Sequence, residues 1–463
     1  MRVEHLLAAT EGALVAGSPN MEFHGTVADS RSIKGGELFV ALPGIRSDGH
    51  NYVQAAVKAG AAAVMVSKDV GLNVDAVAVI RVDDTLKALQ AAALSHRLSW
   101  SGRVVGVTGS VGKTGTREIC ASILSERYNV LKSEKNYNNE IGVPLTLLAL
   151  SKEIEVAVIE MGMRRSGEIA ALACLACPEV GLVTCIGETH LEHLGSVEDI
   201  ARAKAELVQA LPTDGTAVLP ADDPYLNLLK KASSSRCITF GLDAAADIRG
   251  ENISKEESGT SFDICFDGNC VRAFIPLPGR HNVLNSLAAA AVAVSLGVSL
   301  DECTAGLAGL KGPSMRLEML QSNEGFRVIS DVYNAGPAST KAAIDVLSGI
   351  KAKRRIAVLA DMLELGLASN RLHREIGAYV VERGTDILFT YGSEAAGIGL
   401  GAAAAGMNER QIYHFSAKKD LAAALLATVA SDDVVLVKGS RGMAMEEIVD
   451  ILLKSGVRNS QSS

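Results

Sequence analysis

The chain has 463 residues, of which 48% are hydrophobic and 21% are charged, with 44 glycines but only 11 prolines. This composition is typical of a globular α/β protein, and the length exceeds what a single hydrophobic core supports. The 53 acidic and 45 basic residues give a net charge of −8 without any long basic run, so we do not expect nucleic acid as a partner.

The sequence predicts neither a signal peptide nor a membrane span. The start, MRVEHLLAATEG, carries Glu4 and His5 and lacks a long apolar core. The longest uncharged run, residues 282–300, is rich in alanine and includes serines, which predicts a buried helix. Eight scattered cysteines fit a reducing cytoplasm, and we interpret Cys174 and Cys177 as packing residues, not as a redox or metal pair.

Residues 1–84 predict a small α/β domain. We expect a strand in GELFVAL (36–42), a helix in NYVQAAVKAGA (51–61) and a second strand in AAVMVS (62–67). Each of these segments has the apolar spacing of its element. The unit is therefore expected to have its own core.

Residues 85–311 alternate between apolar strands and helix-period segments. The strands VVGVTG (104–109), VAVIEMG (156–162) and VGLVTCIG (180–187) predict a parallel sheet with right-handed crossovers. The stretch SFDICFDGNCVRAFIPLPG (261–279) departs from this pattern and predicts antiparallel hairpin strands.

A Gly-Pro turn in LKGPSMRLEML (310–320) indicates the next boundary. Alternation then resumes with FRVISDVY (326–333), RIAVLADM (355–362), DILFTYG (386–392) and DVVLVKGS (433–440). A Rossmann-like domain over residues 312–463 fits this pattern best.

The stretch RVVGVTGSVGKTGTREI (103–119) predicts a phosphate-binding loop between a strand and a helix. Lys113 would reach the phosphates of a nucleotide, and the Thr114 hydroxyl would hold Mg²⁺. The eight-position form of the motif requires a glycine where this chain has Val107. The alternative interpretation is a tight glycine turn without a ligand.

Glu160 ends an apolar strand and is expected to lie at the carboxyl edge of the sheet. We predict that it binds Mg²⁺, and the alternative is a salt bridge to Arg164 or Arg165. The neighbouring Asn138 and Asn139 are donors for phosphoryl oxygens or ordinary turn residues.

His190 follows the next strand, and Lys204 lies in the helix after it. The stretch HLEH (190–193) lacks the further ligands of a zinc site, while Ser196 is expected to cap the helix. Lys204 falls in the middle of that helix's apolar face, where it either extends its charge outward or has a chemical role. Burial would lower the pKa of its amine, and a neutral lysine can add CO₂ to form a metal-binding carbamate.

Together these motifs resemble the Mur ligases, the ATP-dependent amide-forming enzymes of peptidoglycan precursor synthesis. That family uses the shorter loop T-G-[ST]-x-G-K-[ST], which residues 108–114 match, so Val107 is no defect. The resemblance implies an α/β fold with three domains: a small α/β UDP-binding domain (1–84), a central P-loop-type ATPase domain with a mostly parallel sheet (85–311), and a C-terminal Rossmann-like ligase domain (312–463).

Several segments resemble the branch of the family that adds D-alanyl-D-alanine to UDP-N-acetylmuramoyl-tripeptide. They are ADSRSIKGGELFVALPGIRSDGHNYV, NYNNEIGVPLTLL, GEI at 167–169, SDVYNAGPAS and ADMLELG. The D-N-P-R motif of the preceding ligase is absent from the sequence, and folylpolyglutamate synthetases typically lack the DSR domain. The resemblance departs at Val332, Gly336, Ala360 and Arg164, none of which is a predicted metal or phosphate group.

The resemblance also implies roles for individual residues. The catalytic residues would be Lys113, Glu160, His190 and Lys204, and the metal would be held by Thr114, Glu160, His190 and the carbamate of Lys204. The ATP-binding residues would be Thr108, Gly109, Ser110, Val111, Gly112, Lys113, Thr114, Gly115, Asn139, Asn285, Arg316, Asp331, Tyr333 and Asn334. The UDP-substrate residues would be Ser30, Arg31, Asp48, Gly49 and His50. Lys438, Ser440 and Arg441 are expected to face substrate.

The implied reaction transfers the γ-phosphate of ATP, with Mg²⁺, to a peptide carboxylate, and the amine of D-alanyl-D-alanine then attacks the acyl phosphate. The implied partners are the two substrates alone, with no membrane insertion, for a cytoplasmic monomer. One rival is a sibling ligase that adds a different amino acid or dipeptide. Another is a non-catalytic nucleotide-binding scaffold for cell-wall assembly, which would not need Lys113, Glu160, His190 and Lys204 together.

Overall fold

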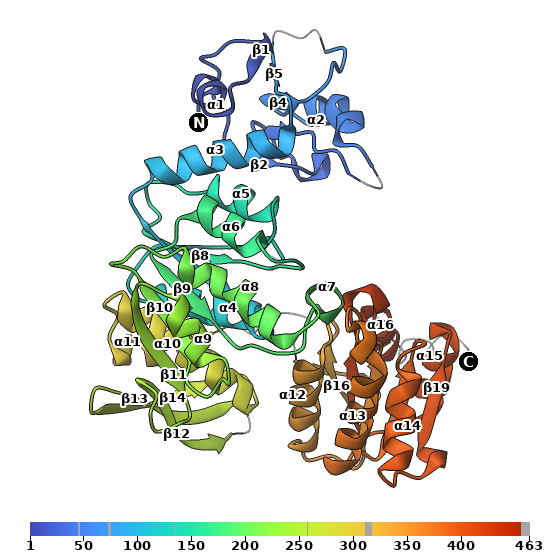
Figure 1. The fold of residues 1–463 in the computed structure, drawn as a ribbon. Helices are drawn as coiled ribbons and strands as arrows, with labels where there is room; N and C mark the ends of the chain where they lie inside the picture. The colour runs from blue at the N-terminus through green and yellow to red at the C-terminus, as the bar shows by residue number, and fades with distance from the viewer. Residues whose placement is uncertain (45–46, 73–75, 135, 257, 311–316, 455–463) are drawn as a thin grey trace.

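The computed structural model describes residues 1–44, 47–72, 76–134, 136–256, 258–310 and 317–454. In this part of the chain the strands form three sheets, each with its own helices (Figure 1). The sheets lie within the predicted ranges 1–84, 85–311 and 312–463. The three-domain α/β class is confirmed, while the domain limits themselves stay predictions.

The N-terminal sheet has the order β1-β5-β4-β3-β2, with β1 antiparallel to β5 and the other pairs parallel. Its strands are β1 (Ala13–Ala16), β2 (Thr26–Val27), β3 (Leu38–Val40), β4 (Ala63–Val66) and β5 (Ala78–Arg81). Its helices are α1 (Val3–Thr10) and α2 (Val53–Lys58), with 3₁₀ turns η1 (Ser30–Ser32) and η2 (Gly49–Tyr52). The two predicted strands and the helix are all present, although each is shorter than its segment.

The helix α3 (Thr85–Ser99) joins this domain to the next. It packs against α1 on one side and against α5 (Gly142–Leu147) and α6 (Glu168–Ala176) on the other (Figure 1). Asp84 caps its start by accepting hydrogen bonds from the amides of Leu86 and Lys87. The first two domains are therefore connected by a helix that both cores share.

The central sheet has nine strands in the order β14-β13-β12-β11-β10-β9-β6-β8-β7. They are β6 (Arg103–Thr108), β7 (Val130–Lys132), β8 (Val156–Glu160), β9 (Val180–Val183), β10 (Thr216–Pro220), β11 (Arg236–Gly241), β12 (Ile248–Lys255), β13 (Thr260–Phe266) and β14 (Asn269–Ile275). The strands from β7 to β12 pair in parallel, and β12, β13 and β14 pair antiparallel, so the predicted hairpin has one strand more than expected.

Helices cover both faces of this sheet. Helices α4 (Lys113–Leu124), α10 (Arg280–Ser295) and α11 (Leu300–Ala308) contact one another and share one core cluster. Helices α3, α5, α6 and α8 (Val197–Gln209) share the opposite cluster, and α9 (Leu226–Ala232) packs on α8. The helix predicted over 282–300 is buried but ends at Ser295, because Gly297 turns the chain with a φ of 85° before α11 begins.

The third sheet has the order β15-β16-β20-β17-β18-β19, with only β15 antiparallel. Its strands are β15 (Glu318–Gln321), β16 (Arg327–Asp331), β17 (Arg355–Ala360), β18 (Ile387–Tyr391), β19 (Ile412–Phe415) and β20 (Val434–Lys438). Its helices are α12 (Pro337–Ser348), α13 (Ser369–Glu382), α14 (Ala396–Ala404), α15 (Lys418–Thr428) and α16 (Glu446–Lys454), with 3₁₀ turns η3 (Gly366–Ala368), η4 (Glu409–Gln411) and η5 (Arg441–Met443).

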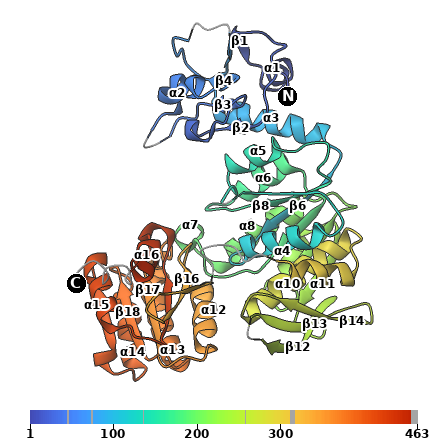
Figure 2. The same cartoon turned by 180° about the vertical axis from the view of Figure 1, so that it is seen from behind.

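The short helix α7 (Leu191–Leu194) leaves the central domain and lies against the third one, as both views of the ribbon show (Figures 1 and 2). It contacts η3 of the third domain and α8 of its own. Leu191 packs on a core cluster of the third domain as well as on one of the central domain. The segment after β9 therefore belongs to two domains at once.

The cysteines differ from the sequence interpretation. Cys265 and Cys270 lie opposite each other in the β13–β14 hairpin and form a disulfide. Cys174 is exposed on α6, so it is not a core-packing residue, and Cys177 ends that helix in a left-handed conformation. Within the described ranges no group of three or more His, Cys, Asp or Glu side chains is arranged to hold a metal ion.

Candidate active site

The predicted phosphate loop joins β6 to α4 at the carboxyl edge of the central sheet. Gly109 and Gly112 have φ values of 146° and 90°, which side-chain-bearing residues rarely adopt. The helix begins at Lys113, so the first N–H groups of α4, which have no acceptor within the helix, lie at the loop. This is the geometry that binds anions in strand–loop–helix units.

The segment that follows β9, residues 184–187, is hydrogen-bonded to the loop. The Ser110 amide donates to the Cys185 carbonyl at 2.9 Å, and the Thr184 hydroxyl donates to the Val111 carbonyl at 2.6 Å. The Ser110 hydroxyl also bonds both polar backbone groups of Gly187, at 2.9 and 3.0 Å. Two neighbouring strand ends therefore hold the loop in one shape.

The side chains of two predicted nucleotide residues are engaged within the protein. The Thr108 hydroxyl is buried and donates to the Met161 carbonyl at 2.9 Å, so its contribution to a phosphate site would come from the backbone. Lys113 Nζ donates to the Gly109 carbonyl at 2.7 Å. The Lys113 ammonium is thereby held at the loop itself.

Asn285 of α10 lies directly against the loop. A Cβ built on Gly112 would lie 2.7 Å from Asn285 Oδ1, and one built on Gly115 would lie 3.4 Å from Asn285 Nδ2. The resemblance assigned Asn285 to the ATP-binding residues. The structure brings this residue and the phosphate loop together, although they are far apart in sequence.

We predict that Gly112→Ala weakens binding of a non-hydrolysable ATP analogue by at least roughly tenfold. A side chain in this left-handed conformation costs about 1–3 kcal/mol, and about 1.4 kcal/mol corresponds to tenfold. The new methyl group would also collide with Asn285. Calorimetric titration tests this, with Gly115→Ala as the control, because that methyl group meets Asn285 at an ordinary distance. Equal affinities for the two variants would contradict the assignment.

Glu160 is buried at the end of β8 and accepts from several groups. Its Oε2 accepts from Thr114 Oγ1 at 2.9 Å and from Arg117 Nη1 at 3.1 Å, while Oε1 accepts from Asn138 Nδ2 at 2.8 Å. Ser133 Oγ accepts from the Glu160 amide at 3.1 Å. The alternative salt bridge expected with Arg164 or Arg165 is wrong.

The partner of Glu160 among the arginines is Arg117, which the sequence interpretation missed. Arg117 lies one helical turn after Thr114 on α4, so both side chains reach Glu160 from the same helix face. The amides of Arg164 and Arg165 instead donate to Glu168 at the start of α6. The i, i+3 spacing from Thr114 was the signal that could have identified Arg117.

Lys204 is buried in the middle of α8, with 2% of its surface exposed. Burial lowers the pKa of its amine well below the ordinary value for lysine, and the charge of Lys113 lowers it further. The Ser196 cap that starts this helix is confirmed, since the Ser196 side chain accepts from the Asp199 amide. Lys204 therefore does not extend its charge outward into solvent.

His190 lies just beyond β9 with a left-handed backbone, at a φ of 57°. Its Nδ1 lies 2.6 Å from Glu364 Oε2 in the third domain. That hydrogen bond lowers the pKa of the Glu364 carboxyl group. The sequence did not indicate Glu364 as a partner, because the two residues lie in different domains.

The side chains at the loop include ligands of the kind that Mg²⁺ binds. Mg²⁺ prefers oxygen ligands, and the Thr114 hydroxyl and Glu160 carboxylate are such ligands lying 2.9 Å apart. Among the described residues, no three or more His, Cys, Asp or Glu side chains are grouped so that they could hold a metal ion. The protein therefore offers few further acidic ligands at this position. A metal at this position would therefore also depend on oxygens from a nucleotide or from a modified Lys204.

The third-domain residues predicted for the nucleotide are joined by Lys438. Lys438 Nζ is buried, lies 2.5 Å from Asp331 Oδ2 and donates to the Asn334 carbonyl at 2.8 Å. Ser440 donates to the Ala335 carbonyl at 3.2 Å, so Lys438 and Ser440, two of the three residues expected to face substrate, both have structural partners.

Three further residues of this set remain predictions. Arg441 pairs with Glu446 at 3.0 Å, and Tyr333 lies between β16 and α12. Arg316 lies outside the described residues, so its predicted role has no structural account. Asn139, in the central domain, accepts from the Gly142 amide at the start of α5 at 2.9 Å.

The predicted UDP-substrate residues form two clusters in the N-terminal domain. Arg31 pairs with Asp29, which caps η1, next to Ser30. Asp48 accepts from the His50 amide at 2.9 Å and from Lys68 Nζ at 2.6 Å, and the Lys68 hydrogen bond is the main reason that the pKa of Asp48 lies below its usual range. Gly49 approaches the Leu42 backbone so closely that a Cβ would lie 2.7 Å from it.

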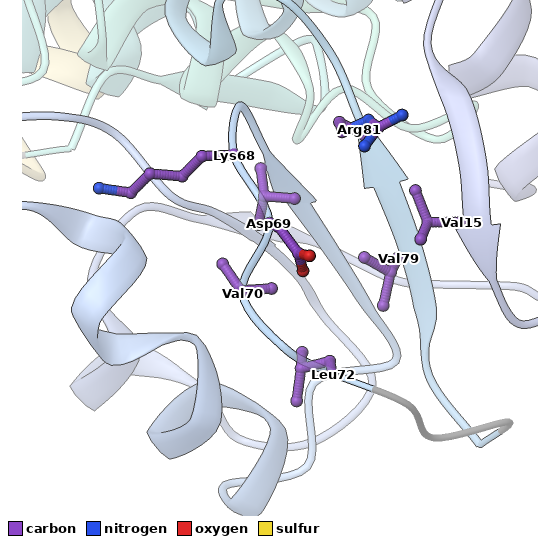
Figure 3. A pocket seen from close by; sticks show the side chains of 8 residues that line it. Val15, Lys68, Asp69, Val70, Leu72, Val79 and Arg81 are labelled. Carbon is purple, nitrogen blue, oxygen red and sulfur yellow. The ribbon is translucent and has the colours of Figure 1, made fainter.

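A small pocket lies beside the Asp48 cluster, with Lys68 in both (Figure 3). Figure 3 shows Val70, Leu72 and Val79 around it and Arg81 at the end of β5. The lining residues are Val15, Val66, Lys68, Asp69, Val70, Leu72, Val79 and Arg81. Lys68, Arg81 and the carboxylate of Asp69 thus lie next to apolar side chains of the N-terminal sheet.

Comparison with known proteins places these features in a family. The Mur ligase family catalytic domain matches residues 22–97, the Mur ligase middle domain matches 107–293, and the Mur ligase glutamate ligase domain matches 315–441. A UDP-N-acetylmuramoyl-tripeptide–D-alanyl-D-alanine ligase from Bacillus subtilis is 40% identical over 457 residues, which are 98% of each chain.

Solved structures agree with this match. A crystal structure of MurF from Acinetobacter baumannii superposes with a TM-score of 0.88 at 30% identity, covering 98% of each chain. MurF ligase from Thermotoga maritima, solved in complex with ADP, superposes with a TM-score of 0.80 at 29% identity, covering 94% of this chain and 99% of that one. Every helix in the described part of the chain is too short or too polar to cross a lipid bilayer.

Proposed function

Because the chain belongs to the Mur ligase family, we propose that it joins D-alanyl-D-alanine to UDP-N-acetylmuramoyl-tripeptide with cleavage of ATP to ADP and phosphate. The relatives that carry this activity in their names align over nearly the whole length of both chains. The reaction is amide-bond formation in peptidoglycan precursor synthesis. It makes the protein a ligase.

One observation carries the proposed chemistry. The phosphate loop with Lys113, the buried Glu160 and the buried Lys204 meet at the carboxyl edge of one sheet. A scaffold that only binds nucleotide needs the loop but not a lysine kept in apolar surroundings, because burying an amine is unfavourable. The combination therefore supports phosphoryl transfer over binding alone.

The residues of the loop would act on the phosphates by position and charge. Lys113 and the first amides of α4 would hold the terminal phosphates of ATP and stabilise the charge that develops as the γ-phosphoryl group leaves. The peptide carboxylate would take that group and become an acyl phosphate. The amine of D-alanyl-D-alanine would then attack the acyl carbon, so that the amide C–N bond forms, inorganic phosphate leaves and the nitrogen gives up a proton to solvent. Alignment of the three reacting groups away from water would supply much of the rate.

We further propose that Mg²⁺, when bound, is held by Thr114, Glu160, His190 and a carbamate on Lys204 and neutralises charge on the phosphate oxygens. Asn138 and Arg117 would keep the Glu160 carboxylate in place from two sides. The lowered pKa of Lys204 favours the neutral amine, which is the form that adds CO₂. The carbamate would also place a negative charge near the Lys113 ammonium, where a second ammonium would be repelled.

We assign the remaining predicted site residues to the uridine-nucleotide precursor and to ATP. The clusters around Arg31 and Asp48 would receive the uridine-nucleotide end of the precursor, and Asn285, Asp331, Tyr333 and Asn334 would approach the nucleotide base and ribose. A cytoplasmic location and a monomeric state belong to the same proposal, since ATP and the nucleotide precursor are cytoplasmic compounds. Size-exclusion chromatography with light scattering would test the monomer.

Phosphate release with ATP and UDP-N-acetylmuramoyl-tripeptide tests the function directly. We expect release only when D-alanyl-D-alanine is also present, because the acyl phosphate then has an acceptor. Turnover with meso-diaminopimelate or lysine in place of the dipeptide would instead favour a sibling ligase. Tight ATP binding without phosphate release, in the presence of both substrates, would identify a scaffold.

A further inference from the structure

The segment that carries His190 is held by the third domain at several points. His190 Nδ1 lies 2.6 Å from Glu364 Oε2, and the Glu192 amide donates to the Glu364 carbonyl at 3.4 Å. Two residues earlier, Glu188 pairs with Arg371 at 2.9 Å. Both the side chain and the backbone of Glu364 therefore contact this segment.

Packing between the domains fixes the same segment. Leu191 packs on the third-domain core, and a Cβ built on Gly366 would lie only 3.1 Å from Glu192 Cα. The His190 backbone is left-handed, a conformation that a non-glycine residue keeps only where its surroundings enforce it. The His190 carbonyl accepts from the His193 and Leu194 amides of its own segment, and the His190 ring contacts Glu364 of the third domain.

The hydrogen bond to Glu364 decides which nitrogen of the His190 ring carries the proton. A carboxylate only accepts hydrogen bonds, so Nδ1 must be the donor. In a neutral imidazole the other nitrogen, Nε2, then has a free electron pair and can bind a cation. Histidines that bind metals usually have this arrangement, with the second nitrogen bonded to a carboxylate or carbonyl.

We propose that Glu364 is the positioning residue of His190, so that docking of the third domain completes the metal-binding side of the central domain. The proposal rests on the proposed function, in which His190 is a metal ligand. It assigns to a third-domain residue a role in metal affinity without direct contact to the metal. A reaction that needs both domains would then gain its full metal site only when they are docked.

The nearby pair of Glu188 and Arg371 provides a matched control. It also joins the central and third domains, at 2.9 Å, and it lies two residues from His190 in the chain. Neither of its side chains touches His190 or another proposed ligand in the described contacts. If Glu364 only attaches the domains to each other, losing either pair should have the same consequence.

The test measures binding of Mn²⁺, as the probe ion, to the full-length protein with a non-hydrolysable ATP analogue, by electron paramagnetic resonance. We expect Glu364→Ala to weaken Mn²⁺ binding by about 10- to 100-fold, the range found for partners of metal-bound histidines. Glu364→Gln keeps an acceptor and should recover part of the affinity. Arg371→Ala should stay within about twofold of the wild type, because an exposed ion pair contributes little.

A double-mutant cycle decides whether Glu364 acts through His190. In the background of His190→Ala, the change Glu364→Ala should cause no further loss of Mn²⁺ affinity. Additive losses, or equal losses in Glu364→Ala and Arg371→Ala, would overturn the proposal. Melting temperatures within a few degrees of wild type for each variant are expected, since both Glu364 and Arg371 are partly or largely exposed.

This experiment separates the inference from the proposed function. Wild-type phosphate release with both substrates is measured first and does not depend on the variants. If wild type turns over and Glu364→Ala binds Mn²⁺ as tightly as wild type, the positioning role is wrong and the function stands. If Mn²⁺ binding falls as expected but the two substrates give no turnover, the positioning role stands and the substrate assignment fails.

Discussion

Replacing Lys113 by alanine is expected to lower the turnover number by about 10³-fold, the effect of removing one fixed charge from a phosphoryl-transfer or oxyanion site. Lys113 Nζ lies 2.7 Å from the Gly109 carbonyl, so the ammonium is held at the loop where the phosphates are proposed to bind. Without it, charge developing on the γ-phosphoryl group would lose its nearest counterion among the side chains of the loop. Steady-state phosphate release with both substrates measures this change.

Lys113→Arg is the matched control for charge. A guanidinium keeps the positive charge but is planar and wider than an ammonium, so we expect an intermediate rate. The melting temperature should change little in either variant, because Lys113 is only partly buried and donates to the Gly109 and Ser110 carbonyls of the loop itself. An alanine variant that retains more than a tenth of wild-type turnover would show that Lys113 has no such role.

The second large effect is expected at Lys204. Lys204→Met should lower turnover by about 10²-fold or more, the scale found when one stabilising group is removed from such a site. Methionine has a similar length and is apolar, so it fills the space without leaving a cavity. It also removes the unfavourable burial of an amine, and the variant should therefore melt at the wild-type temperature or above it.

The carbamate gives Lys204 a second, independent signature. Protein equilibrated with ¹³C-labelled CO₂ should show a carbamate carbon signal in the wild type and none in Lys204→Met. In Lys204→Ala, added bicarbonate should restore part of the lost activity, because the shortened side chain leaves space for a small carboxylate-like anion. Unchanged turnover in the alanine variant, or a wild type without any carbamate signal at high CO₂, would remove the carbamate from the mechanism.

Lys113 and Lys204 are linked by their charges. The Lys113 charge helps to lower the pKa of Lys204, so the two amines lie close enough to repel each other. Burial and the Lys113 charge both lower the pKa of Lys204 and so disfavour its protonated form. A carbamate on Lys204 would replace this repulsion by attraction, which gives one physical reason for a lysine in the middle of an apolar helix face.

The elements of the phosphate site were predictable because they depend on local order in the chain. A strand, a glycine loop and a helix in succession place Lys113 and Thr114 at a helix start, whatever surrounds them. Glu160 was predictable for the same reason, since it ends the next parallel strand and the carboxyl ends of parallel strands share one edge. The apolar periodicity of α8 likewise indicated that Lys204 is buried.

Two details of the structure differ from the sequence interpretation: the arginine that pairs with Glu160, and the end of the buried helix. The sequence interpretation offered Arg164 and Arg165 to Glu160 because they are close in the chain, whereas Arg117 reaches it from a helix on the other side of the loop. The buried helix predicted to end at residue 300 stops at Ser295, because a composition rich in alanine does not show where a glycine turn interrupts it. Nearness in sequence and uniform composition are weak indicators of where side chains meet.

What the amino-acid sequence alone determined is the kind of elements, their order and the residues placed at strand ends, since these follow from periodicity and local backbone geometry. Only the tertiary structure decided which residues far apart in the chain meet: Asn285 against Gly112 within the central domain, and Glu364 against His190 across two domains. The first contact depends on how α10 packs on α4, and the second on how two separately folded domains dock, and no periodic signal in one segment encodes either arrangement. The positions of Lys113, Thr114, Glu160 and Lys204 were therefore readable from the central domain, whereas the contact of His190 with Glu364 of the third domain was not.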